Sequence, residues 1–258
     1  MEYVFALAIG ITLGLMGSGG SILTVPVLVY IGCVLPATAI NYSLFIVGIT
    51  SLAGVVNYGL KKMVNFKAAI TFALPSLVSV VLVRSWLLPQ IPETILTTNA
   101  FTLSKSLALM LLFAVFMLVA ARGMLKKSAQ VAETNTSPSR TRLVITGFFT
   151  GMITGLLGAG GGFLIVPALV LVLKQDIKQA VGTSLLIIAL NALTGFTADL
   201  PNTQPDWGFL IGFSGISIVG LLLGVYLSKF ISGAKLKPLL GWFILAMGVF
   251  IIVKELVL

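Results

Sequence analysis

Long apolar stretches separated by short polar connections make up nearly the whole chain. Six of them have close to the ~20 residues that an α-helix needs to cross a bilayer. They cover residues 38–60, 68–88, 106–125, 178–198, 208–230 and 238–257. Two longer stretches, 3–31 and 143–173, are each interrupted by a cluster of glycines. The pattern predicts an all-α polytopic membrane protein in which two of the hydrophobic segments are broken.

The two glycine clusters have nearly the same sequence. One is Gly14-Leu-Met-Gly-Ser-Gly-Gly-Ser-Ile-Leu-Thr-Val-Pro26, and the other is Gly155-Leu-Leu-Gly-Ala-Gly-Gly-Gly-Phe-Leu-Ile-Val-Pro167. A shift of 141 residues aligns them without a gap and also aligns Asn65-Phe66 with Asp206-Trp207. Such agreement in glycines is not expected by chance between two apolar stretches, so it indicates an internal repeat. We predict two homologous units, each with a glycine-broken or re-entrant segment plus three transmembrane helices. Their bounds are 1–125 and 143–258, and the cytoplasmic linker 126–142 joins them.

The basic residues indicate how the two units are oriented. If each glycine-broken stretch enters and leaves on the same side, thirteen Lys and Arg residues face the cytoplasm and three face outward. If all eight stretches simply cross, the division is nine against seven. The first division fits the positive-inside rule and predicts inverted repeats, as in many secondary transporters. A direct repeat of eight crossing helices remains the alternative.

The glycines themselves indicate a ligand site. Without a Cβ, Gly19-Gly20 and Gly160-Gly161-Gly162 can turn sharply and approach a ligand closely. The segments that follow, 22–30 and 163–173, then begin as half-helices whose positive ends attract anions. Irregular backbone at membrane depth must be buried in protein or line a watery cavity, so we expect the two breaks to meet near the midplane. The alternative is that the glycines serve only close helix packing.

Composition excludes several classes of protein. Hydrophobic residues make up 58% of the chain and charged residues 9%, which is outside the range of soluble domains. The net charge of +9 lies in the connections, so membrane topology explains it and no nucleic-acid partner is expected. With no histidine and a single cysteine, Cys33, the chain lacks the usual ligands of zinc, haem and iron. We therefore expect no metal, no cofactor and no enzymatic activity.

Polar residues inside the apolar stretches are the remaining candidates for binding. Asn41 and Asn191 are the sharpest, because polar groups at that depth are costly and an amide seldom bonds to its own helix. Ser43 and Ser184 occupy equivalent places in the two units. Arg84 is expected to extend to the outer interface, with anion binding as the alternative, and no carboxylate is expected mid-membrane. The candidate substrate-binding set is Gly17, Ser18, Gly19, Gly20, Ser21, Asn41, Ser43, Gly158, Gly160, Gly161, Gly162, Ser184 and Asn191.

The repeated pattern G-x-x-G-x-G-G-[SG]-x-L-x-V-P, present in both halves of a chain of this size, resembles the sulfite exporter TauE/SafE family of permeases. The resemblance covers essentially the whole chain. It implies alternating-access transport of small anions, sulfite or organosulfonates, outward across the cytoplasmic (inner) membrane. The expected partners are the anionic substrate and the lipid bilayer. Proton-coupled transport of other organic anions, or a non-transporting membrane assembly subunit, remains an alternative.

Overall fold

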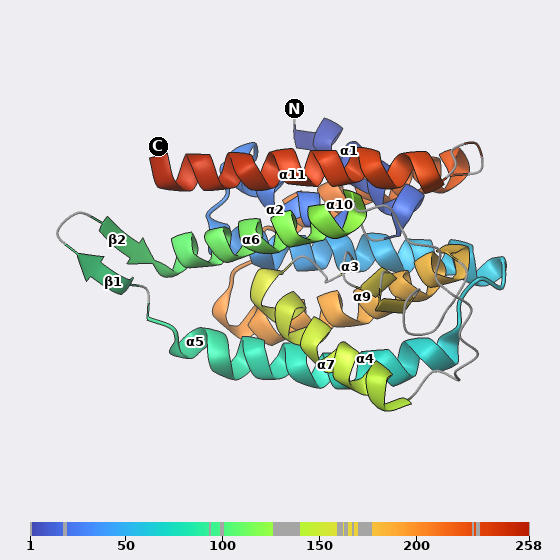
Figure 1. Cartoon of the computed structure of the whole chain (residues 1–258), viewed down its shortest axis with the longest axis horizontal. Coiled ribbons are helices and arrows are strands. Elements are labelled where there is room, and N and C mark those ends of the chain that lie inside the picture. Colours follow the sequence, from blue (N-terminus) through green and yellow to red (C-terminus); the bar gives the residue numbers. More distant parts are fainter. Residues whose placement is uncertain are drawn as a thin grey trace.

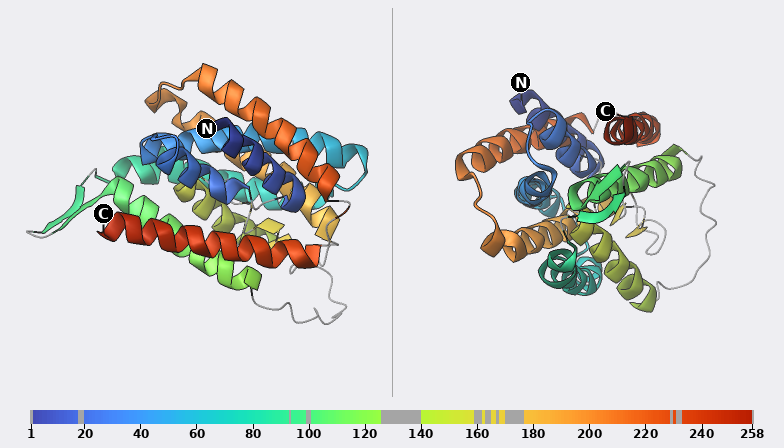
Figure 2. Two further views of the ribbon diagram at one scale, coloured as in Figure 1. Left: turned by 90° about the horizontal axis from the view of Figure 1, so that it is seen from above. Right: turned by 90° about the vertical axis from the view of Figure 1, so that its left-hand side faces the viewer.

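The protein is a bundle of helices that run broadly along its long axis, with a small hairpin projecting from one end (Figure 1). The computed structural model describes residues 2–17, 20–92, 94–98, 101–125, 140–158, 162, 165–166, 168–169, 177–228, 230 and 233–257, and every structural statement below concerns these residues. Seen along the long axis, α4 and α11 are close to end-on at the edge of the bundle (Figure 2).

The helices follow the predicted apolar stretches closely. The first half contains α1 (Glu2–Met16), α2 (Ser21–Tyr30), α3 (Pro36–Leu60), α4 (Phe66–Leu82), the π-helical turn η1 (Val83–Leu87), α5 (Leu88–Gln90), β1 (Thr94–Thr98), β2 (Phe101–Ser104) and α6 (Lys105–Leu125). The second half contains α7 (Arg140–Leu157), α9 (Ile177–Asp199), the 3-10 turn η2 (Leu200–Asn202), α10 (Trp207–Leu227) and α11 (Gly233–Val257).

Within the described residues, five helical stretches are long and apolar enough to cross a membrane, as expected of a multi-pass protein. They are Pro36–Leu60, Phe66–Gln90, Lys105–Gly123, Gln179–Asp199 and Trp207–Leu227. These correspond to five of the six predicted stretches, and the sixth lies within α11. The prediction of helical structure is thus confirmed, with one addition: β1 and β2 form a two-stranded antiparallel hairpin that the hydrophobic pattern does not predict.

Equivalent signals start α4 and α10. The side chain of Asn65 accepts a hydrogen bond from the backbone N–H of Ala68 at 3.0 Å. Asp206 accepts from the N–H of Phe209 at the same distance. Each side chain satisfies one of the amide groups that the first turn of a helix leaves without an intrahelical partner. Both helices therefore begin where the aligned pairs Asn65-Phe66 and Asp206-Trp207 stand.

Helices α3 and α9 pack against each other in opposite directions at the centre of the bundle. At one end, the Asn41 amide donates to the carboxylate of Asp199. At the other end, the backbone N–H of Asn65, just after α3, donates to the hydroxyl of Thr183 at 3.0 Å. The N-terminus of α3 therefore lies beside the C-terminus of α9, and the reverse holds at the far end.

Two parallel pairs, α1 with α10 and α4 with α7, flank this central pair. An added Cβ at Gly10 would overlap the carbonyl oxygen of Ser217, and one at Gly151 would overlap the carbonyl oxygen of Ser76. Glycine lets the two backbones approach closely, which is a common way to pack membrane helices. The contact in one pair reproduces the contact in the other, with both residues shifted by 141 positions.

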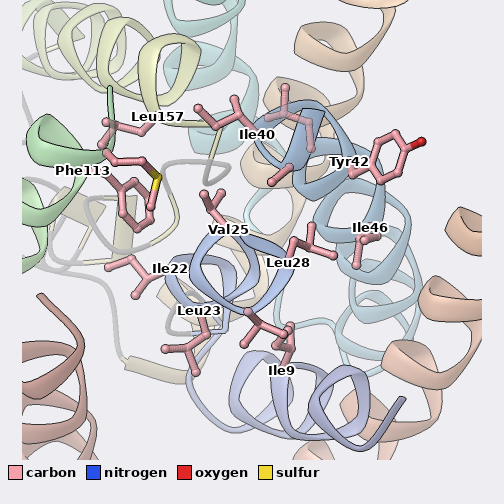
Figure 3. Close-up of a cluster of buried hydrophobic side chains, with 14 of the residues drawn as sticks. Ile9, Ile22, Leu23, Val25, Leu28, Ile40, Tyr42, Ile46, Phe113 and Leu157 are labelled. Carbon is pink, nitrogen blue, oxygen red and sulfur yellow. The ribbon is translucent and has the colours of Figure 1, made fainter. Parts of the chain in front are cut away.

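The short helix α2 lies inside the bundle rather than on its surface. Ile22, Val25 and Leu28 are buried, and Figure 3 shows them among Ile40 of α3 and Phe113 of α6. The outer surface of the bundle is apolar as well. Large hydrophobic side chains point outward from several helices, including Val56, Leu60, Leu74, Val78, Ile211 and Trp242. An apolar exterior of this kind suits a lipid environment.

Candidate functional site

A glycine in the left-handed conformation ends the first helix of each half. Gly17 follows α1 with φ +68°, and Gly158 follows α7 with φ +66°. Their backbone N–H groups donate to the carbonyl oxygens of Leu13 and Thr154, at 2.7 and 2.9 Å. Glycine adopts this conformation without steric cost and commonly terminates helices in this way. The helix breaks predicted at these two places are therefore confirmed.

Each break is held by a serine from the other half of the chain. The Ser43 hydroxyl of α3 lies 2.6 Å from the carbonyl oxygen of Gly158 and 2.8 Å from that of Ile40 in its own helix. The Ser184 hydroxyl of α9 lies 3.5 Å from the carbonyl oxygen of Gly17 and 2.8 Å from its own-helix carbonyl. The pairing of Ser43 and Ser184 inferred from the sequence thus corresponds to equivalent contacts, one closer than the other.

The two glycine turns do not lie side by side. Ser184 is near the start of α9 and Ser43 is near the start of α3, and these helices are antiparallel. The turns are therefore separated along the helix pair by roughly 20 Å, at 1.5 Å of rise per residue. The expectation that both breaks meet near the midplane is thus wrong for Gly17 and Gly158, because each turn rests against the first turns of the opposite central helix.

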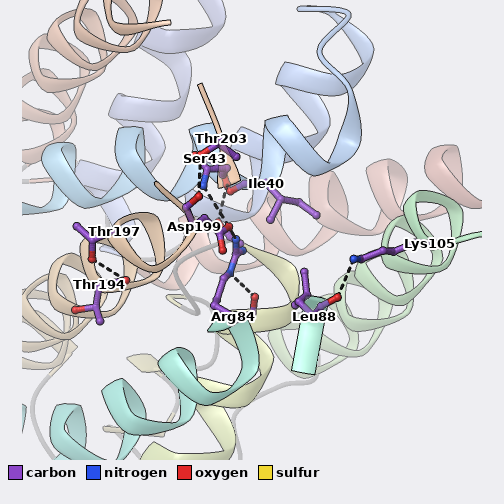
Figure 4. Close-up of polar contacts among 12 residues, drawn as sticks. Ile40, Ser43, Arg84, Leu88, Lys105, Thr194, Thr197, Asp199 and Thr203 are labelled. Carbon is purple, nitrogen blue, oxygen red and sulfur yellow. Dashed lines mark hydrogen bonds and ion pairs between the residues drawn. The ribbon is translucent and has the colours of Figure 1, made fainter. Parts of the chain in front are cut away.

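A buried arginine lies beside the second break. Arg84 belongs to the π-helical turn η1 and is only 2% exposed. Its Nε donates to the carbonyl oxygen of Gly155 at 2.7 Å, and its Nη1 forms an ion pair with Asp199 (Figure 4). The expectation that this side chain extends to the outer interface is wrong. The carboxylate of Asp199 compensates its charge within the protein, so the arginine need not reach water.

Asp199 and Asn41 complete this polar cluster. Asp199 is the last residue of α9, and its side chain is 19% exposed. The same carboxylate oxygen that contacts Arg84 also accepts from the Asn41 amide at 3.2 Å. Asn41 Oδ1 and Arg84 Nη2 are buried without a hydrogen-bond partner in the described part of the chain. The site therefore combines a cation with unused donor and acceptor capacity.

Asn191 lies away from the glycine turns. Its amide donates to the hydroxyl of Ser76 on α4 at 2.6 Å, so it connects two helices of different halves. Gly20 and Ser21 are buried at the start of α2, and an added Cβ at Gly20 would overlap the backbone of Ile9. Gly162 is buried and helical. Four predicted site residues lie outside the described residues: Ser18, Gly19, Gly160 and Gly161.

The structure brings together part of the predicted site and adds two residues to it. Asn41, Ser43 and Gly158 form one cluster, and Arg84 and Asp199 belong to it although neither was in the predicted set. The available signal was that Arg84 is a basic residue inside an apolar stretch, which in a membrane protein indicates an acidic partner. Groups of three or more His, Cys, Asp or Glu residues that could hold a metal ion are absent from the described residues.

Comparison with known proteins gives a consistent result. Residues 3–251 match the family model described as "Sulfite exporter TauE/SafE". A probable membrane transporter protein of Xylella fastidiosa (strain Temecula1) is 29% identical over 255 residues, which cover 95% of this chain and 91% of the relative. One from Methanocaldococcus jannaschii is 27% identical, with the same coverage. The probable membrane transporter protein YunE of Bacillus subtilis is 25% identical, covering 89% of each chain.

Proposed function

Because the chain belongs to the sulfite exporter TauE/SafE family, we propose that this membrane transporter moves small oxidised-sulfur anions, sulfite or organosulfonates, outward across the cytoplasmic membrane by alternating access. The observation that carries the proposal is the reciprocal contact at the two helix breaks. Ser43 of the first half holds the Gly158 turn, and Ser184 of the second half contacts the Gly17 turn. A movement of one half relative to the other would alter both turns at once.

We also propose that the two halves are inverted repeats. Equivalent helices α3 and α9 run antiparallel, so a two-fold axis that exchanges the halves must be perpendicular to these helices. The contact of Gly10 with Ser217 corresponds to the contact of Gly151 with Ser76, because a shift of 141 residues relates Gly10 to Gly151 and Ser76 to Ser217. For helices that cross a bilayer, such an axis lies in the membrane plane, as in transporters with inverted repeats.

The distribution of charge supports the same arrangement. The C-terminus of α3 and the N-termini of α4, α9 and α11 lie at one end of the bundle (Figure 1). Lys61, Lys62 and Lys67 are exposed there. The opposite end holds α5, which directly follows the turn η1 that contains Arg84, and the start of α6 at Lys105 (Figure 1). The positive-inside rule then assigns the lysine-rich end to the cytoplasm.

The proposal has a direct test in proteoliposomes that contain the purified protein. A membrane potential of 100 mV, inside negative, favours the exit of each negative charge by about 2.3 kcal/mol. We expect flux of radiolabelled sulfite to follow an imposed potassium-diffusion potential and to persist when the proton gradient is collapsed. Taurine, a sulfonate that carries no net charge at neutral pH, is the matched control, and its flux should not follow the potential. If the protein moves none of the three anions sulfite, methanesulfonate and sulfoacetate, the proposal is contradicted and a non-transporting assembly subunit is favoured.

A proton-coupled carrier of organic anions is the second candidate, and one observation favours it. The Asp199 carboxyl group is partly exposed and contacts the buried arginine, and carboxyl groups form the proton relays of many transporters. Flux that ignores the potential but follows an imposed pH gradient would support this candidate. The two mechanisms are separated by clamping the potential with valinomycin while the pH gradient is varied.

A further inference from the structure

Not every nitrogen of the Arg84 guanidinium has a hydrogen-bond acceptor. Nε and Nη1 have partners, whereas Nη2 is buried without an acceptor among the described residues. A buried charged donor that lacks an acceptor is costly, because the group has given up its hydrogen bonds to water. The side chain also stands on a π-helical turn, and such turns occur often at functional sites. These features indicate that the guanidinium has capacity for another ligand.

Asp199 is placed where a helix does not favour a carboxylate. It is the last residue of α9, and the negative end of the helix dipole disfavours an acidic side chain there. Its position is therefore explained by its contacts with Arg84 and Asn41 rather than by helix capping. Because its side chain is 19% exposed, the carboxylate can leave the arginine for water more readily than the arginine can leave the bundle.

The corresponding place in the other half carries no ion pair. A shift of 141 residues relates Asp199 to Tyr58 and Arg84 to Val225. The Tyr58 hydroxyl lies 3.5 Å from the carbonyl oxygen of Gly14, which corresponds to the Gly155 oxygen that Arg84 contacts. A neutral tyrosine thus occupies the place of the ion pair in the first half. The charge of the second site is therefore not a requirement of the packing.

We propose that Arg84 binds the transported anion, and that Asp199 occupies its guanidinium when no anion is bound. This inference rests on the proposed function and assigns its substrate contact. An oxyanion with two accessible oxygens can take Nη2 and Nη1 together, since the planar guanidinium matches such ligands in a two-point contact. The anion then replaces Asp199 at Nη1, and the carboxylate turns toward water. On release, Asp199 returns to the arginine.

The mechanism defines the class of substrate. Sulfite, sulfonates and carboxylates each present two oxygens to the fork of the guanidinium, whereas chloride is a single centre and cannot offer a separate acceptor atom to each N–H group. The Asn41 amide donates to the same Asp199 oxygen that contacts Arg84. Asn41 is therefore placed to donate to the anion once Asp199 has moved. Competition between the bound anion and Asp199 also provides a means of release, because the internal carboxylate can displace the anion.

The test compares three variants by titration calorimetry of the detergent-solubilised protein with sulfite and with methanesulfonate, and by flux in proteoliposomes. Because Arg84→Gln removes the two-point, charge-assisted contact, it should weaken anion binding by about 100-fold or more. Asp199→Asn should bind more tightly than the wild type and yet transport more slowly, because the competitor for the arginine has been weakened. Arg122→Gln, on the exposed face of α6, is the matched control and should behave like the wild type.

The double variant Arg84→Gln/Asp199→Asn protects the test against misfolding, because it leaves no buried charge uncompensated. It should elute and melt like the wild type and bind both anions far more weakly than the wild type does, as Arg84→Gln is expected to. Wild-type affinity in this variant would overturn the inference, as would weakened binding in Asp199→Asn, which is the outcome expected of a purely structural ion pair. If the wild type itself binds and transports none of the anions, the proposed function fails together with this inference. If only the variants behave unexpectedly, the function stands and the assignment fails.

Discussion

At the residue scale, the two left-handed glycines tolerate a side chain poorly. A Cβ at Gly158 would overlap the side chain and carbonyl of Ile40, and the φ of +66° disfavours any L side chain. We expect Gly158→Ala to lower the free energy of unfolding by about 1–2 kcal/mol from the conformation alone. Unfolding of the purified protein, followed by circular dichroism in mixed micelles, would measure this.

Gly215→Ala is the matched control for that variant. Gly215 lies in α10, and an added Cβ there has no atom within 4 Å. The free energy of unfolding of the control should equal that of the wild type or slightly exceed it, because alanine is the better helix former. Equal stability of Gly158→Ala and Gly215→Ala would show that the turn at Gly158 does not require glycine.

Some site residues could be predicted from the sequence because the repeat marks them twice. Ser43 and Ser184, like Gly17 and Gly158, were found by their equivalent positions and make equivalent contacts. Arg84 was misjudged for a physical reason. Snorkelling is the cheapest solution for a single arginine near a helix end, but a carboxylate at the end of another helix makes burial possible. The identity of that partner depends on how α4 and α9 pack, which the sequence does not state.

At the scale of elements, the contact between α4 and α9 includes a buried polar pair. The Asn191 amide donates to the Ser76 hydroxyl at 2.6 Å, and both side chains are fully buried. In a double-mutant cycle with Asn191→Ala and Ser76→Ala, we expect a coupling energy of ~0.6 kcal/mol and at most about 1.7 kcal/mol, the range found for hydrogen bonds between membrane helices. The cycle is measured by equilibrium unfolding of the four proteins, and additive effects would mean that the bond contributes nothing to stability.

The hairpin β1–β2 illustrates what the hydrophobic pattern leaves out. Residues 94–98 are rich in β-branched threonine, which favours strands. The segment lies where the first half has residues without a counterpart in the second, so the internal repeat offered no guide to it. Helix positions, by contrast, follow directly from apolar length, because a span of the bilayer requires about 20 apolar residues. Length and composition therefore predicted the helices but not this insertion.

At the scale of the whole molecule, the sequence and the helix packing give different information about the relation between the two halves. The aligned glycine clusters predict two related halves, and the basic residues predict their relative orientation. What neither pattern predicts is that the halves interlock: α1 of the first half packs along α10 of the second, and α7 of the second along α4 of the first. Which helices pair in this way depends on which glycine-bearing faces pack together. A hydrophobic pattern alone does not specify which two faces do so.

The proposed topology makes a prediction about three positions at the ends of the bundle. Cys33, an exposed free cysteine between α2 and α3, lies at the end opposite Lys62, which follows α3 and is also exposed. Gln204, exposed between α9 and α10, lies at the same end as Cys33. In intact cells, a membrane-impermeant maleimide should label Cys33 of the wild type. In a Cys33→Ser background it should label Gln204→Cys and leave Lys62→Cys unlabelled until the cells are opened. A direct repeat with eight crossings would place Lys62 and Gln204 on one side, so labelling of both from the same face would exclude the inverted arrangement.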